Sequence, residues 1–250
     1  MMILVAHGTR STAGVQMIHD LSSAVAARIG PLRTAFVDVH RPSPAEVLAE
    51  TDGPAVVVPA FLASGYHVHT DLPSRIAESA HPAVSMTPTL GPDPVLAAVM
   101  HDRLREVGWR RGDAVVMAAA GSSDPRARRE LQWAAALLTT QVGPVRLGFV
   151  ATGSPQVGDL VDEMRAAGRR RIFIATYLLA PGLFHDRLTD CGATAVAAPL
   201  GLHPRVVDLI VDRFAAEPRR DGHQRGKLRV GTTWNTVSAQ AASERMADVA

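Results

Sequence analysis

Histidines and one aspartate directly follow apolar runs in the first part of the chain. His7 follows the run Ile-Leu-Val-Ala, and Asp38 ends the run Ala-Phe-Val-Asp. His67 and His69 lie in the polar segment after a third run. Neutral imidazole binds divalent metal ions, and carboxylate oxygens complete many such sites. Imidazole also accepts protons near pH 7. These residue types indicate a divalent metal site with open coordination positions, a proton-transfer site, or both.

The apolar runs are expected to be buried parallel strands, because both of their faces carry apolar residues. Helical stretches separate them, many with proline near the first turn, which is typical of an α/β fold with helices on both faces of a parallel sheet. Since ligands bind beyond the carboxyl ends of such strands, His7, Asp38 and His67 are expected at one sheet edge. The expected strands are 2–6, 34–39, 55–59, 83–87, 114–119, 145–150, 171–176 and 193–198, and the expected helices are 12–29, 44–49, 72–79, 94–107, 125–140, 155–167, 184–191 and 204–215.

The two sets of four strands indicate an internal repeat. His7-Gly8-Thr9 corresponds to Ala120-Gly121-Ser122, and Ala35-Phe36-Val37 corresponds to Gly148-Phe149-Val150. The prediction is therefore two similar three-layer α/β/α domains, residues 1–110 and 111–217, each with a four-stranded parallel sheet. Residues 218–250 are expected to be a flexible basic tail with a short helix near 241–249.

The second half lacks most of the chemistry-bearing residues of the first. Ala120 stands in place of His7, Ala151 falls near the position of Asp38, and only His185 remains. The first domain is therefore expected to carry the active site, and the second to carry a degenerate one.

Charge and composition exclude several classes of protein. Residues 218–250 hold six basic and three acidic residues, which leaves 20 basic and 21 acidic residues elsewhere, so nucleic acid is not expected as the partner. The single cysteine, Cys191, excludes an intramolecular disulfide and a site built from several cysteines. No apolar run approaches the roughly 20 residues of a membrane span, and the first residues do not resemble a signal peptide. A cytoplasmic protein that does not act at a membrane is expected.

Three segments resemble the sirohydrochlorin chelatases, in particular the long, internally duplicated form of that family. They are Ile-Leu-Val-Ala-His-Gly-Thr-Arg at residues 3–10, Phe-Val-Asp-Val with Pro-Ser-Pro-Ala-Glu at 36–39 and 42–46, and Val-Val-Pro-Ala-Phe-Leu-Ala-Ser-Gly-Tyr-His-Val-His-Thr-Asp-Leu-Pro at 57–73. The resemblance covers about residues 1–215. It implies an enzyme that inserts Fe2+ or Co2+ into sirohydrochlorin, in sirohaem or cobalamin biosynthesis.

The resemblance also implies roles for particular residues. His7 and His67 correspond to the two active-site histidines of the family, expected to bind the metal and accept pyrrole protons. Asp38 falls where the family often carries a glutamate near the metal, and it is the third expected metal ligand. The metal is a substrate, no organic cofactor is expected, and the protein is expected to be a monomer or small homo-oligomer. The expected substrate-binding residues are Arg10, Ser64, Gly65 and Tyr66, with Arg41 and Arg75 as further arginines for the carboxylates.

Two other functions fit some of these residues. A non-catalytic tetrapyrrole or metal carrier would keep the fold and one binding histidine. A histidine-type phosphatase would use His7 as its nucleophile, but such sites usually carry an arginine just before the His-Gly pair, where this chain has Ala6. The presence of both His7 and His67 favours the chelatase.

Overall fold

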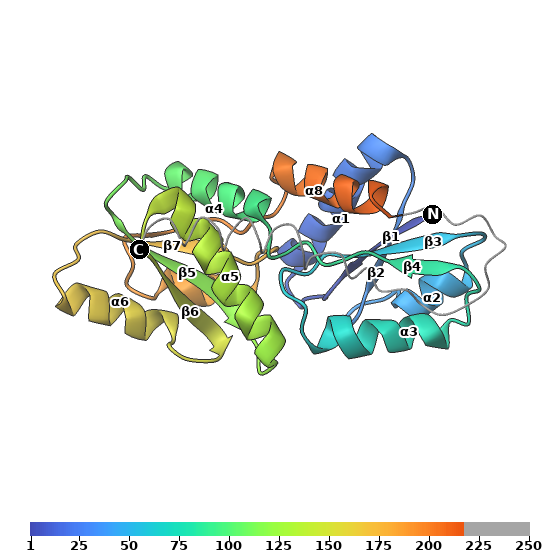
Figure 1. Ribbon diagram of the computed structural model, residues 1–250, viewed down its shortest axis with the longest axis horizontal. Coiled ribbons are helices and arrows are strands. Elements are labelled where there is room, and N and C mark those ends of the chain that lie inside the picture. The colour runs from blue at the N-terminus through green and yellow to red at the C-terminus, as the bar shows by residue number, and fades with distance from the viewer. Residues whose placement is uncertain (218–250) are drawn as a thin grey trace, which may run out of the picture.

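The computed structural model describes residues 1–217, so the tail at 218–250 and its expected helix at 241–249 lie outside the described residues. Strands and helices alternate along the described chain (Figure 1). The first half contains β1 (Met2–Ala6), α1 (Thr12–Ile29), β2 (Arg33–Phe36), α2 (Pro44–Ala49), β3 (Ala55–Pro59), η1 (His67–Asp71), α3 (Leu72–Glu78), β4 (Val84–Met86) and α4 (Pro94–Glu106). The second half contains β5 (Ala114–Gly121), α5 (Pro125–Val142), β6 (Val145–Thr152), α6 (Val157–Ala166), β7 (Ile172–Tyr177), α7 (Leu183–Thr189), β8 (Ala195–Val196) and α8 (Pro204–Ala215).

The strands form two parallel four-stranded sheets with the same topology. Their orders are β2-β1-β3-β4 and β6-β5-β7-β8. The repeat extends to the register, because Val5 is opposite Ala35 in the first sheet and Ala118 is opposite Gly148 in the second. The expected α/β fold with two similar four-stranded parallel sheets is confirmed.

Alternate residues of each central strand point to opposite faces, as the pleat of a strand requires. Leu4 of β1 and Met117 of β5 belong to one continuous core that α1, α4, α5 and α8 share. Ile3 of β1 packs towards α2 and α3, while Val116 of β5 packs towards α6 and α7. Each sheet therefore lies between two helical layers, and one of these layers belongs to a core common to both halves.

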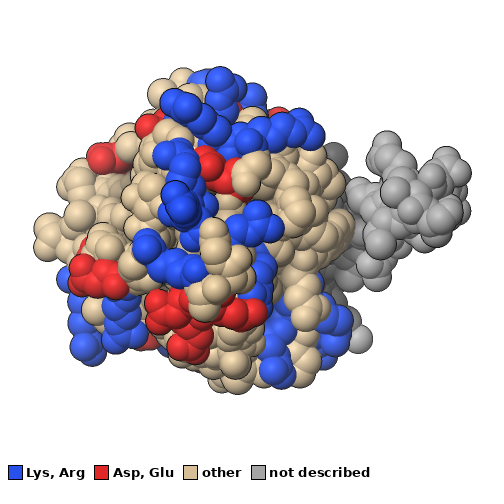
Figure 2. Space-filling view, turned by 90° about the vertical axis from the view of Figure 1, so that its left-hand side faces the viewer, with Lys and Arg blue, Asp and Glu red and all other residues tan. Residues whose placement is uncertain are grey.

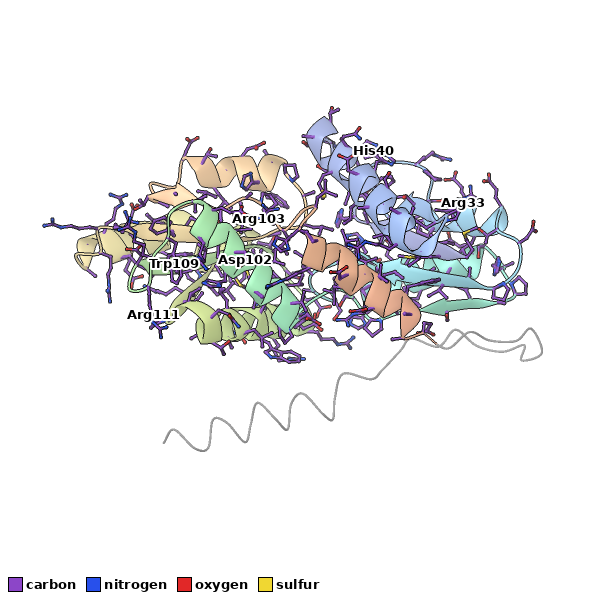
Figure 3. All side chains as sticks on the ribbon, turned by 90° about the horizontal axis from the view of Figure 1, so that it is seen from above. Arg33, His40, Asp102, Arg103, Trp109 and Arg111 are labelled. Carbon is purple, nitrogen blue, oxygen red and sulfur yellow. The ribbon has the colours of Figure 1, made fainter. Side chains whose placement is uncertain are left out.

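The two halves exchange their last helices. Helix α4 follows the first sheet in the chain, yet it packs against α5 and β7 of the second. Helix α8 follows the second sheet, yet it packs against α1 and β3 of the first (Figure 1). In Figure 3, Asp102 and Arg103 of α4 lie in the same packed unit as Arg111 of the second half. Arg33 and His40 lie in the other packed unit.

This exchange affects how the expected division at residues 110 and 111 relates to the packed units. A division at residues 110 and 111 follows the repeat in the sequence but does not separate the packed units, because each unit takes its last helix from the other half. The apolar stripe of a helix predicts that this face is buried, but it does not predict which sheet the face packs against.

Local sequence explains where the main helices begin. The side chain of Ser11 accepts a hydrogen bond from Gly14 N at the start of α1. Ser43 and Glu46 form a capping box at α2, where Pro44 occupies the first turn. Asp93 caps α4, which also begins with a proline. These side chains satisfy backbone N–H groups that have no partner within the helix.

Some element ends differ from the expected ones. Strand β2 stops at Phe36, so Asp38 lies in the turn beyond the strand and not at its end. Helix α6 begins at Val157, two residues after Pro155, because Pro155 O still accepts a hydrogen bond from Phe149 N beside β6. Strand β8 is only two residues long.

The surface and length of the helices bear on possible partners. None of the helices within residues 1–217 is long and apolar enough to cross a membrane. Figure 2 shows the outer end of the second half, where many arginine side chains are interspersed with smaller groups of acidic ones. This end lies away from the side where the two halves meet.

Candidate active site at the meeting of two sheet edges

The segments that follow the strands of both halves meet at one place. A Cβ atom built on Gly65, after β3, would lie 3.7 Å from Ser122 Oγ, after β5. A Cβ atom built on Gly182, after β7, would lie 3.3 Å from Thr9 Oγ1, after β1. The carboxyl edges of the two parallel sheets therefore face each other, and the expected site lies between them.

His7 is placed by a tight turn at the end of β1. Gly8 has φ +93°, and a Cβ atom there would lie only 2.0 Å from the carbonyl oxygen of Asp38. The same approach lets Asp38 N donate to His7 O at 3.0 Å. Glycine at position 8 thus allows the turn after β1 to pack directly on the turn after β2, and this packing fixes where the His7 side chain starts.

His67 opens a single π-helical turn, η1, that continues into α3. Its Nδ1 lies 2.9 Å from Asp71 Oδ2, and the other carboxylate oxygen of Asp71 accepts from Arg75 Nε at 3.1 Å. Because a carboxylate accepts hydrogen bonds, His67 donates its Nδ1–H, and the Nε2 of the neutral ring carries the free lone pair. Asp71 therefore orients the ring and fixes its tautomer, as carboxylates commonly do for metal-binding histidines.

The rings of His7 and His67 form a pair. Their centroids are 4.5 Å apart with an interplanar angle of 73°. Although His7 keeps an exposed edge, burial lowers the pKa of its imidazole, and the nearby His67 lowers that pKa further. The Gly8 backbone and the carboxylate of Asp38 act in the opposite direction. The lowered pKa favours the neutral form of His7, which has a lone pair for a proton or a metal ion.

Asp38 lies near this pair without completing a three-ligand set. Its Oδ1 accepts a hydrogen bond of 2.8 Å from Val39 N, a residue held at φ 66°. Within residues 1–217, no group of three His, Cys, Asp or Glu side chains is arranged to hold a metal ion. Of the three expected ligands His7, Asp38 and His67, the structure brings the two histidine rings together. Asp38 acts on His7 through its charge.

The polar groups of Ser64, which was expected to bind substrate, form hydrogen bonds within the protein. Its backbone N–H donates to Glu130 Oε2 at 2.5 Å, and its hydroxyl donates to Glu130 Oε1. Glu130 belongs to α5 of the second half. Ser64 therefore anchors the loop before His67, and the hydrogen of its hydroxyl is already donated to Glu130. No local pattern indicated Glu130 as its partner, because that residue lies 66 residues further along the chain.

The remaining residues expected to bind substrate differ in their availability. Tyr66 is 62% exposed, and its ring centroid is 5.8 Å from that of His67. Arg10 is exposed and forms no ion pair within the described part of the chain. Arg41 pairs with Glu46, and Arg75 pairs with Asp71. Of the three arginines considered from the sequence, only Arg10 keeps its guanidinium unpaired within residues 1–217.

The corresponding edge of the second half is built for contact with the first. Ala120 and Ala151 carry no chemistry, and the retained His185 has its Nε2 3.3 Å from Ala197 O in its own half. The segments after β5 and β7 instead contact Gly65 and Thr9. That the first half carries the active site and the second a degenerate one stays a prediction, and these contacts are consistent with it.

Comparison with known proteins places this architecture in a family. The CbiX family model matches residues 1–107 and 114–217, which are the two copies of the repeat. The chain belongs to the CbiX family. This confirms the resemblance seen in the sequence.

A curated relative and solved structures show how far the CbiX likeness extends. A sirohydrochlorin ferrochelatase of Bacillus subtilis is 25% identical over 173 residues, which are 63% of this chain and 66% of the relative. The chain thus matches slightly less than two thirds of that relative's length.

Two solved structures share the fold of this CbiX-family chain. SirB from Bacillus subtilis with Fe3+ has a TM-score of 0.74 at 23% identity, covering 86% of this chain and 93% of that one. The sirohydrochlorin chelatase SirB from Bacillus subtilis subspecies spizizenii, in complex with cobalt, has a TM-score of 0.67 at 19% identity, covering 85% and 92%. At these identities the likeness establishes the common architecture of the two halves.

Proposed function

We propose that this protein is a sirohydrochlorin chelatase that inserts Fe2+, or Co2+, into its tetrapyrrole substrate. The observation that carries the proposal is the pair formed by His7 and His67, 4.5 Å apart between ring centroids, at the meeting edge of a CbiX-family fold. The name of the Bacillus subtilis relative, a sirohydrochlorin ferrochelatase, supports this choice of reaction.

The chemistry of metal insertion suits the two imidazoles. The reaction must remove two pyrrole N–H protons and transfer a metal ion from the protein to the macrocycle. Neutral His7 can accept a proton, and the Nε2 of His67 can accept a proton or hold the metal. Two histidines without a third ligand hold the ion more loosely than a closed four-ligand site, which favours its release. The carboxylate of Asp38 stabilises His7 once it has taken up a proton.

The surroundings of the pair suit a flat, anionic macrocycle. Tyr66 presents an exposed ring from the first half, and the exposed Leu183 and Phe184 begin α7 in the second half. The start of α7 lies beside Thr9, in the turn that follows His7. We assign Tyr66 and the backbone at Gly65 to contact with the ring, and Arg10 to a substrate carboxylate.

Several finer points belong to the same proposal. Iron and cobalt both accept imidazole ligands, so the choice of metal follows from supply as much as from the site. The reaction uses the metal as a substrate, and no step in it calls for an organic cofactor. The sequence expectations of a cytoplasmic location and of a monomer or small homo-oligomer complete the proposal.

Visible absorption spectroscopy tests the function directly. Sirohydrochlorin mixed with Fe2+ or Co2+ and the protein should show a catalysed shift of its absorption bands. His7→Ala and His67→Ala should each abolish that shift while circular dichroism shows an intact fold. His19→Ala, which changes an exposed histidine of α1, is the matched control and should retain activity. Near-normal turnover by both site variants would overturn the proposal, and tight product retention without turnover would identify a carrier.

A further inference from the structure

The loop before His67 is fastened to the second half at successive residues. Both oxygens of the Glu130 carboxylate accept hydrogen bonds from Ser64, one from its N–H and one from its hydroxyl. Within residues 1–217 Glu130 forms no ion pair, so the contact with Ser64 is its principal polar interaction. Glu163, another glutamate of the second half, behaves differently, since it pairs with Arg146 on the surface.

Two further contacts hold the same loop. The hydroxyl of Tyr177, a residue only 2% exposed, donates to Leu62 O at 2.9 Å. Gly65 packs on Ala127 of α5, with 3.7 Å between a Cβ atom built on the glycine and the Cβ of the alanine. Residues 62–65 are therefore held by side chains from β7 and α5, both of which belong to the half without the histidine pair.

The position of this loop is transmitted to His67 through the backbone. Gly65 O accepts hydrogen bonds from Val68 N at 3.0 Å and from His69 N at 3.1 Å. These bonds close the first turn of the segment that contains His67. A displacement at residues 64 and 65 consequently moves the turn and the imidazole that it carries.

We propose that Glu130 is a positioning residue, which holds the loop at Ser64 against α5 so that the His67 ring stays beside His7. Its catalytic consequence rests on the proposed chelatase function. In this interpretation the second half supports the site, because it supplies the helix that holds the loop before His67. Misplacement of a reacting group by about 1 Å can reduce a rate about 100-fold.

The test compares Glu130→Ala, Glu130→Gln and the matched surface variant Glu163→Ala. Glu130→Ala should lower kcat about 100-fold and also raise KM for sirohydrochlorin, because the displaced loop carries the His67 turn together with the proposed ring contacts at Gly65 and Tyr66. Glu130→Gln should recover most of this loss, since one side-chain oxygen still accepts from Ser64 N. Glu163→Ala should match the wild type. The visible spectrum of Co2+ added alone should change in Glu130→Ala and be restored in Glu130→Gln.

Two additional measurements keep the outcomes distinct. If the wild type shows no insertion of either metal, the proposed function fails, and the Co2+ spectrum together with amide hydrogen exchange at residues 64–69 still tests the positioning role. If Glu130→Ala does not fold, Ser64→Ala removes only the hydroxyl contact and should lower kcat several-fold. Wild-type kcat and an unchanged Co2+ spectrum in Glu130→Ala, or in Ser64→Ala where that variant replaces it, would overturn the proposal. Equal losses in Glu163→Ala would do the same.

Discussion

Arg213 provides the sharpest test of how the exchanged helix α8 is held. Its Nη2 donates to Asp93 Oδ2 at 2.9 Å, and its Nε donates to Thr89 O at 3.2 Å. The side chains of Arg213 and Asp93 are only 15% and 8% exposed. Asp93 is also the residue that caps α4, through a bond of 2.8 Å from Val95 N to Oδ1. One buried ion pair therefore joins the end of α8 to the start of α4.

Arg213→Met keeps the apolar stem and removes the charge, which leaves the Asp93 carboxylate buried without its cation. Loss of one partner of a buried pair costs about 3–5 kcal/mol in the free energy of unfolding. The chain offers a matched control, because Arg28 of α1 pairs with Asp208 of α8 at the same distance of 2.9 Å, but with 55% and 52% of the side chains exposed. Arg28→Met should cost about 0–1 kcal/mol, since water screens an exposed pair.

Urea unfolding followed by circular dichroism measures both variants. The double variant Arg213→Met with Asp93→Asn should lose less than Arg213→Met alone, because asparagine still accepts from Val95 N and carries no charge. A loss below about 1 kcal/mol in Arg213→Met, or a loss equal to that of Arg28→Met, would refute the assignment of a buried interhelical pair.

Three further predictions follow from the histidine pair and its supports. Asp71→Ala should weaken Co2+ binding about 10–100-fold, because His67 loses the group that orients it. Co2+ titration measures this, and affinity equal to the wild type would contradict it. Gly8→Ala should lower the free energy of unfolding by at least about 1 kcal/mol more than Gly30→Ala, which shares a positive φ but faces open space; equal urea midpoints would show that the close approach is unimportant. The pKa of His7 is lowered on folding, so the unfolded chain binds the proton more readily, and stability should fall as pH decreases from about 6.5 towards the folded pKa. His7→Gln should remove that part of the pH dependence, and unfolding measured at pH 7.5 and 5.5 should reveal it.

The histidine pair could be predicted from the sequence because its signals are local. His7 directly follows a buried strand, and the strand order of a parallel α/β sheet brings the ends of β1 and β3 together. The orientation of His67 was also accessible in principle, since Asp71 follows it by four residues and Arg75 follows Asp71 by four. The repeat was visible because matching residues recur in order at a nearly constant offset, as Ala35-Phe36-Val37 and Gly148-Phe149-Val150 illustrate.

The contacts between the halves could not be predicted in the same way. Ser64 was interpreted as a substrate contact because a serine in a glycine-containing loop gives no sign of a partner on a distant helix. Glu130 itself looks like an ordinary surface residue of an amphipathic helix. The sheet against which α4 or α8 packs could not be predicted either, because the repeat makes the apolar faces of the two helices alike. Only the packing in three dimensions decides which sheet each helix covers.

The exchange of α4 and α8 has a consequence for the way the chain folds during synthesis. The last strand of the first sheet ends at Met86, and the helix that completes the cover of that sheet begins at Pro204, 118 residues later. At a synthesis rate of about 5–20 residues per second, the interval is on the order of ten seconds. Throughout that interval one apolar face of the nascent first unit lacks its native cover. Helix α4, which is already made and is related to α8 by the repeat, is the nearest substitute. Folding on the ribosome would then pass through a temporary arrangement in which the first half covers itself, and it would end with a change of partner when α8 emerges.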